Sequence, residues 1–151
     1  MRVPSVLSFA LAATLSAGGV SAQSPKTFKA RLSPVPIDVA MQATIAGTGS
    51  ISAVLTGTKL AITGTFEGLR SPATIAQVHK GPVKGARGPV AFELTVSKAS
   101  DGTSGTLAGT IELTAIQLAD LEKGRLYVQV HSEKAPDGNL WGWLLPQENR
   151  R

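Results

Sequence analysis

Apolar side chains recur at every second position along most of this chain, and this period constrains the fold more than any other feature. The segments 90–96 and 126–131 are the clearest examples. A period of two places one side of each segment in a core and the other in water or against a partner. Turn-forming residues separate the segments, among them Gly47–Gly49, Gly88–Pro89 and Pro136–Gly138. The pattern predicts an all-β chain with antiparallel neighbours, either a sandwich or a barrel.

One segment departs from this rhythm and predicts a short helix. Thr114 and Gln117 have the spacing of a capping box, and Ile116, Leu118 and Leu121 follow at helical intervals. Gly124 then supplies a stop signal. We therefore expect a helix over 115–123 that connects two strands as a crossover and closes one end of the fold.

The first 22 residues have the layout of a secretory signal peptide. Arg2 precedes an apolar run over 6–20, and Val20 and Ala22 supply the short side chains of a cleavage site. A transmembrane anchor is the alternative, but the run is shorter than the roughly 20 residues that a bilayer requires. We expect residues 23–151 to form one domain in the periplasm or outside the cell. Without cysteine, this domain depends on its core alone.

Charge and motifs exclude several classes of function. The chain carries a formal net charge of +5, but its cations are spread out and its aromatic residues are few. Nucleic-acid binding is therefore not expected, because it requires clustered cations with interleaved aromatic rings. The sequence also lacks the nucleophile elbow of hydrolases and the glycine loop that holds a nucleotide phosphate. These features favour a protein that is not an enzyme.

Several motifs together resemble the CHRD (chordin-type) domain. Gly68-Leu69 precedes Ala76-Gln77-Val78-His79, and Gly81-Pro82 follows. The most specific part is the run Gly124-Arg125-Leu126-Tyr127-Val128-Gln129-Val130-His131-Ser132 with the closing Pro136-Asp137-Gly138-Asn139-Leu140-Trp141-Gly142. The likeness spans roughly residues 28–145. It implies an extracytoplasmic, immunoglobulin-like, Greek-key β-sandwich, a module found in chordin-like extracellular antagonists and in bacterial exported proteins, with no assigned activity.

This sequence departs from the family pattern at four positions. Gln77 stands where the family has its first histidine, and Gln129 where it has an asparagine. Asn139 replaces a glutamate and Trp141 an arginine. A role that needs two histidines in one strand, or the Glu/Arg pair, is therefore not expected of this chain.

The two histidines, His79 and His131, are the candidate metal ligands. In each strand they share a side with a glutamine, Gln77 or Gln129, so neighbouring strands would gather all four into one polar patch. Neutral imidazole binds copper and zinc well, but a catalytic zinc generally has three protein ligands. The patch also resembles the His-x-His strands of copper/zinc superoxide dismutase, with Gln77 in the place of one ligand. The alternative is that both imidazoles only form hydrogen bonds at strand ends.

The segment 80–88 is rich in glycine and carries Lys80, Lys84 and Arg87. It can act as a mobile loop or as an anion-binding surface. Trp141 and Trp143 alternate in the last strand, where they either pack against the fold or stack on a partner. The sequence thus predicts an exported module that binds an unidentified protein or cell-surface partner through Gln77, His79, Gln129, His131, Lys80, Lys84, Arg87 and Trp141. It predicts no cofactor; copper or zinc binding, a superoxide-dismutase-like activity and adhesion to an anionic polymer are the alternatives.

Overall fold

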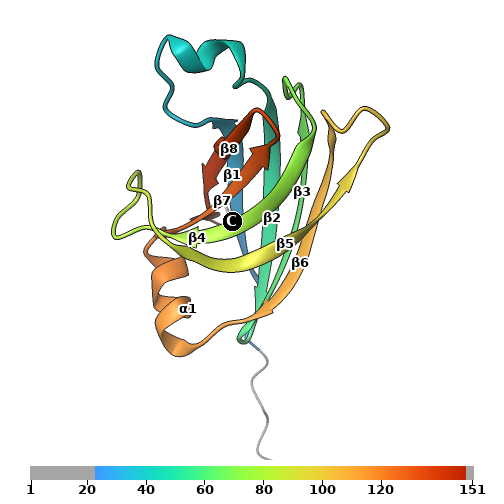
Figure 1. Cartoon of the computed structure of the whole chain (residues 1–151). Coiled ribbons are helices and arrows are strands. Elements are labelled where there is room, and N and C mark those ends of the chain that lie inside the picture. The colour runs from blue at the N-terminus through green and yellow to red at the C-terminus, as the bar shows by residue number, and fades with distance from the viewer. Residues whose placement is uncertain (1–22, 149–151) are drawn as a thin grey trace, which may run out of the picture.

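The computed structural model describes residues 23–148 (Figure 1). The predicted signal peptide, residues 1–22, lies outside them. The described chain forms nine strands, one α-helix and one 3₁₀ helix. In chain order they are β1 (Lys26–Pro34), η1 (Ala40–Ala43), β2 (Thr48–Thr56), β3 (Lys59–Glu67), β4 (Ala73–Lys80), β5 (Val90–Lys98), β6 (Gly105–Glu112), α1 (Ala115–Glu122), β7 (Leu126–Ser132), β8 (Ala135–Trp143) and β9 (Leu145–Pro146).

The strands close into an eight-stranded antiparallel barrel, so the immunoglobulin-like sandwich expected from the resemblance is wrong, although the all-β class is correct. The strand order is β2-β3-β6-β5-β4-β7-β8-β1, and β1 pairs with β2 to complete the circle. Seven residue pairs join β1 to β2, from Lys26↔Leu55 to Leu32↔Gly49. On its other edge β1 meets β8 at Ser33↔Trp141 and β9 at Phe28↔Pro146. Closure leaves no long open sheet edge, which removes the exposed backbone groups that invite aggregation.

The inward side chains fill the barrel as the alternation predicted. In β1, Phe28 and Leu32 are fully buried, and Ile51 and Ile62 face them from β2 and β3. β5 has the most regular alternation, yet Val90 is 48% exposed and only Leu94 is buried. Alternation determines to which side of the strand a residue points. Whether that side is buried depends on other parts of the chain that pack over it.

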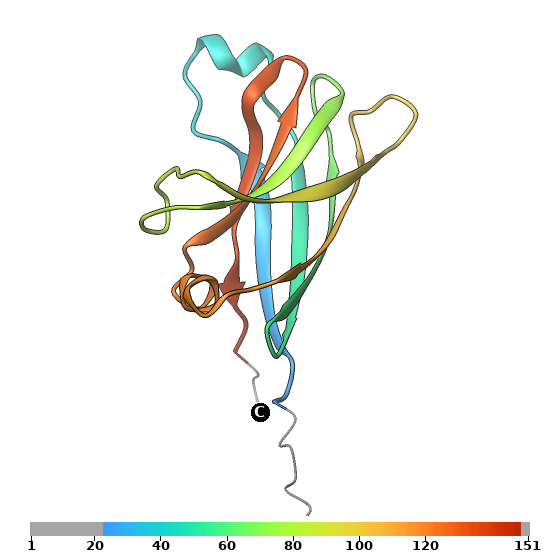
Figure 2. The ribbon, with the colours of Figure 1, turned by 60° about the horizontal axis from the view of Figure 1, so that its bottom comes forward.

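The predicted helix is confirmed. Thr114 accepts from the backbone N–H of Gln117, and the Gln117 side chain accepts from the Thr114 N–H, which completes the capping box. Gly124 ends the helix with φ +65°. α1 carries the chain from β6 to β7, which are not neighbours in the barrel, and it covers one end of the barrel (Figure 2).

One predicted turn is wrong. Pro136–Gly138 lies inside β8, and the hairpin between β7 and β8 turns at residues 133–134 instead. Ser132 already pairs with Ala135, so the strand resumes before the proline. A proline is tolerated near the start of a strand, where its missing N–H need not join the ladder.

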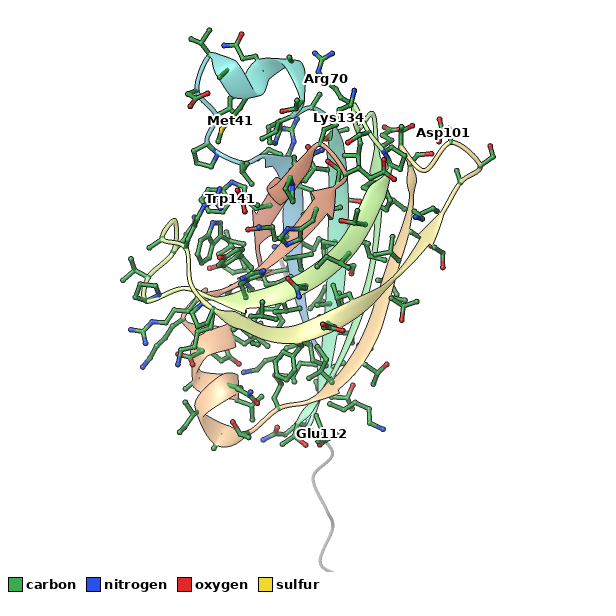
Figure 3. The ribbon with its side chains drawn as sticks, viewed as in Figure 1. Met41, Arg70, Asp101, Glu112, Lys134 and Trp141 are labelled. Atoms are coloured by element: carbon green, nitrogen blue, oxygen red, sulfur yellow. The ribbon has the colours of Figure 1, made fainter. Side chains whose placement is uncertain are left out.

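Two segments cover the outside of β4, β7 and β8. One is the loop 81–89 between β4 and β5. The other is the segment 35–47, which contains η1; its Val35 and Ile45 form a small apolar cluster with Ala135, and Trp141 packs against it. Figure 3 shows Trp141 and Met41 on the same side of the molecule as the loop 81–89.

Candidate functional site

Strand pairing brings the predicted site residues together on three adjacent strands. β4 pairs with β7 so that Gln77 faces Gln129 and His79 faces Tyr127. β7 pairs with β8 so that Gln129 faces Trp141 and Tyr127 faces Trp143. Val78, Val128 and Val130 point into the barrel core. The paired residues just named alternate with these valines or lie opposite their neighbours, so they project from the outer face of the barrel. We call His79, Tyr127, Gln129, His131, Trp141 and Trp143 the histidine cluster.

The histidine cluster is covered by other parts of the chain and is not an open polar surface. Gln129 is 3% exposed, and His79 and His131 are each 7% exposed. Gly88 of the loop 81–89 lies directly over it: its N–H donates to the Tyr127 hydroxyl at 3.1 Å. Only glycine fits there, because a Cβ on Gly88 would lie 1.7 Å from the carbonyl oxygen of Lys80.

Both imidazoles are fixed through Nδ1. The Nδ1 atom of His79 lies 2.9 Å from the Gly88 carbonyl oxygen, and that of His131 lies 2.8 Å from the Pro136 carbonyl oxygen. A carbonyl oxygen only accepts, so each Nδ1 donates a hydrogen, and in the neutral ring Nε2 keeps its lone pair. Burial lowers the pKa of His131, the largest of several effects on that ring, and so favours its neutral form.

The two Nε2 atoms differ in their partners. The Nε2 of His131 lies 3.4 Å from the Nε2 of Gln129, which also donates to the Asp137 carbonyl oxygen at 3.0 Å. The Nε2 of His79 is buried and has no hydrogen-bond partner among residues 23–148. The ring centroids of His79 and His131 lie 6.2 Å apart. A buried acceptor without a partner is uncommon in a folded protein and needs an explanation.

Aromatic rings line the rest of the cluster. Tyr127 stacks on His79 with centroids 5.0 Å apart and an angle of 18° between planes. The ring centroid of Tyr127 lies 4.5 Å from that of Trp143 and 5.8 Å from that of Trp141. Both tryptophans of the chain therefore pack against the fold, as one of the two sequence interpretations held.

The cations of the predicted basic surface are largely engaged within the chain. Lys80 forms an ion pair with Asp120 at 2.7 Å. Arg87 donates to the Asp137 carbonyl oxygen at 3.1 Å, and its guanidinium lies 5.9 Å from the centroid of the Trp141 ring. Lys84 is exposed. Adhesion through these three cations stays a prediction.

Sequence reasoning missed two contributors to this region. Tyr127 shares its side of β7 with Gln129 and His131, and this parity was the available signal for including it. Asp120 of α1 is 4% exposed and holds both Lys80 and Arg125; no local pattern connects these residues. Lys80, which donates to the carboxylate, lowers the pKa of Asp120, and Arg125 adds to this effect.

Within residues 23–148, no three or more histidine, cysteine, aspartate or glutamate side chains are grouped so that they could hold a metal ion. An ion at the histidine cluster would therefore take its protein nitrogen ligands from His79 and His131 alone. No helix in the described part of the chain is long and apolar enough to cross a membrane.

A match to a protein-family model identifies the family of this domain. The CHRD domain model matches residues 28–144. This chain belongs to the CHRD domain family. The family consists of non-enzymatic, β-rich modules with a binding or structural role. No curated protein and no solved structure matches the chain.

The structure locates the four departures of this chain from the CHRD pattern. Gln77, Gln129 and Trp141 are direct cross-strand neighbours in one row over β4, β7 and β8. Asn139 lies two residues from Trp141 on β8 and donates to Ser132 at 2.8 Å. The departures thus gather on the face that carries the histidine cluster.

Proposed function

We propose that this chain is an exported CHRD module that binds without catalysing a reaction, and that it binds a copper or zinc ion between His79 and His131. The observation that carries the proposal is the buried Nε2 of His79, which has no hydrogen-bond partner in the described chain. Leaving such a group unpaired costs about 1–3 kcal/mol, and a metal ion would use its lone pair.

The hydrogen bonds of the two histidines support this proposal. Histidines that bind metals almost always donate their other ring N–H to a carbonyl or carboxylate, which fixes the tautomer and the ring orientation. His79 and His131 do this through Gly88 and Pro136. The lowered pKa of His131 keeps that ring in the neutral state that a metal requires.

The number of ligands favours binding over catalysis. A catalytic zinc generally has three protein ligands and one open position, and the histidine cluster offers two imidazoles. Gln77, which replaces a histidine of the family pattern, also removes the His-x-His strand that a superoxide-dismutase-like site would use. Export, to the periplasm or beyond, rests on the signal-peptide layout of residues 1–22.

The test is a titration of the mature chain, residues 23–151, with copper and zinc ions. We expect binding of one ion per chain, detected by calorimetry for both ions and, for Cu(II), also by quenching of Trp141 and Trp143, because both rings contact Tyr127 beside His79. The double variant His79→Ala/His131→Ala should bind at least about 100-fold more weakly to copper.

Two controls make this result specific. Lys84→Ala changes an exposed residue of the covering loop and should bind like the wild type. Circular dichroism of each variant checks that the barrel is intact. Equal binding of both metals by the wild type and the double histidine variant would show that the ion sits elsewhere, and the proposal would be abandoned.

A further inference from the structure

We infer that the histidine cluster selects monovalent copper, Cu(I), in two-coordinate form over Cu(II) and Zn(II). This inference rests on the proposed function, because it names which ion the same two imidazoles hold. Three features of the cluster lead to it: the number of donors, the charge around them and the rings that enclose them.

The first feature is the number of donors. His79 and His131 supply two nitrogen atoms, and the described chain groups no further acidic or thiol side chain with them. Zinc usually takes a tetrahedral set, most often with three or more protein ligands, and Cu(II) favours a tetragonal set of nitrogen and oxygen ligands. The filled d shell of Cu(I) imposes no such requirement, so two imidazole ligands satisfy it.

The second feature is charge. Both donors are neutral in the ligating state, and a cation, Arg87, lies over Trp141 in the same cluster. Asp137 contributes its backbone carbonyl oxygen to Arg87 and Gln129. Because the cost of transferring an ion out of water rises with the square of its charge, a divalent ion pays about four times as much as a monovalent one. Within residues 23–148 no carboxylate oxygen is hydrogen-bonded to either imidazole. The charge of Asp137 acts on His131 without such a bond, and the charge of Arg87 opposes it.

The third feature is the enclosure. The ring of Tyr127 and the backbone of Gly88 contact His79, and Trp141 and Trp143 pack against Tyr127. Zn(II) and Cu(II) would need water molecules to complete their coordination at a two-histidine site, and such waters need several polar partners, which aromatic rings supply poorly.

The remaining polar contact of the His131 Nε2 atom is with Gln129. Its amide nitrogen donates to the Asp137 carbonyl oxygen and lies at a long 3.4 Å from the Nε2 of His131. The Asp137 hydrogen bond holds the amide in place when an ion replaces that long contact. Gln129 thus presents nitrogen, not oxygen, to the ion and adds no third ligand.

The experiment compares three ions on the full mature chain. Cu(I) is supplied without oxygen from a chromophoric chelator that competes for it, and Cu(II) and Zn(II) are titrated separately. We expect the dissociation constant for Cu(I) to be at least about 100-fold below those for the other two ions. The X-ray absorption edge of the Cu(I) complex should show the sharp low-energy feature of two-coordinate copper.

Variants assign the ligands. His79→Ala and His131→Ala, made singly, should each weaken Cu(I) binding by about 100-fold or more. Met41→Leu is the matched control, because Met41 is a soft sulfur donor that lines a recess of about 110 Å³ together with Pro136 and Asp137. Leucine keeps its size and should leave Cu(I) binding unchanged.

The outcomes separate the inference from the function on which it rests. Histidine-dependent binding that is as tight for Zn(II) or Cu(II) as for Cu(I) would overturn the inference and leave the metal-binding function standing. A large loss in Met41→Leu would overturn the two-nitrogen geometry. If no ion binds in a histidine-dependent way, both the inference and the proposed function fail.

Discussion

Gly88 and Gly138 occupy the places where the backbone comes closest to the histidine cluster. A Cβ on Gly138 would lie 2.4 Å from the Nε2 of Gln129, and the residue has φ +128°, which side chains rarely adopt. Gly88 has ordinary φ but even less space, with the Lys80 carbonyl oxygen 1.7 Å from the ideal Cβ position. At the residue scale, the site therefore depends on the lack of a side chain at these two glycines as much as on the imidazoles.

Gly88→Ala should weaken metal binding although it touches no ligand atom. The added methyl group forces the loop 81–89 away from β4, and His79 then loses the carbonyl that fixes its Nδ1. Loss of such an orienting partner costs about 10–100-fold in metal affinity. Titration of Cu(I) against the variant measures this change.

Gly85→Ala is the matched control for that substitution. Gly85 lies in the same loop with φ +89°, and nothing lies within 4 Å of its ideal Cβ position. Strain at this φ costs about 1 kcal/mol of stability, but the contact between His79 and Gly88 should persist. Equal losses of affinity in Gly85→Ala and Gly88→Ala would mean that the loop, and not the orienting carbonyl, sets the affinity.

At the scale of elements, α1 and β4 are joined by an ion pair that spans the end of the barrel. Asp120 lies near the end of α1 and contacts Lys80, the last residue of β4, and Arg125, which precedes β7. The loop 81–89 begins directly after Lys80. The pair therefore anchors one end of the loop that covers the histidine cluster.

This pair predicts a stability difference that depends on pH. The folded pKa of Asp120 lies below its ordinary value of 3.8, so the unfolded chain takes up the proton first as the pH falls. The stabilisation is complete above about pH 5 and is lost as the pH falls through the folded pKa. Asp120→Asn should lower the free energy of unfolding by about 1–2 kcal/mol at pH 7 and by less near pH 3, where the unfolded chain is already protonated.

Urea unfolding at both pH values measures the effect. Glu122→Gln, two residues away in α1, serves as a control. Glu122 pairs with Lys26, but the Glu122 side chain is 41% exposed and the Lys26 side chain 63%. Such a pair contributes about 0–1 kcal/mol. A loss in Asp120→Asn that is equally large at both pH values would assign the effect to packing instead of charge.

At the scale of the whole molecule, closure depends on how near β8 can approach β1. Gly142 makes this approach possible: a Cβ there would lie 2.6 Å from the Arg31 carbonyl oxygen and 3.1 Å from the Cβ of Ala30. β1 is the only strand of the described chain that pairs with both β2 and β8 and so completes the barrel.

Gly142→Ala should therefore destabilise the barrel by about 1–3 kcal/mol, the usual cost of overpacking. Amide exchange should quicken in β1 and β8 before the other strands, as measured by hydrogen–deuterium exchange with mass spectrometry. Gly109→Ala is the matched control within a strand, because its new Cβ would meet only the flexible end of Leu94. Uniformly faster exchange in every strand would contradict a destabilisation that is confined to the contact between β1 and β8.

Much of the fold and part of the site could be predicted from single segments. Alternation identified the strands, and Thr114, Gln117 and Gly124 defined the helix to within one residue. The parity of His79 and Gln77 with Gln129 and His131 predicted that they share a face, which the register of β4 and β7 confirms. The turn at Pro136–Gly138 was misplaced, because turn-forming residues also occur where a strand begins.

The period of two, the helix caps and the family motifs can be read from single segments, because each depends on residues close together in the chain. That the sheet closes through β1 and that the loop 81–89 covers the histidines is visible only in the folded chain. Alternation requires one buried face, and both an open sandwich and a closed barrel provide it. The choice between them depends on contacts between residues as distant as Ser33 and Trp141, which no local pattern encodes.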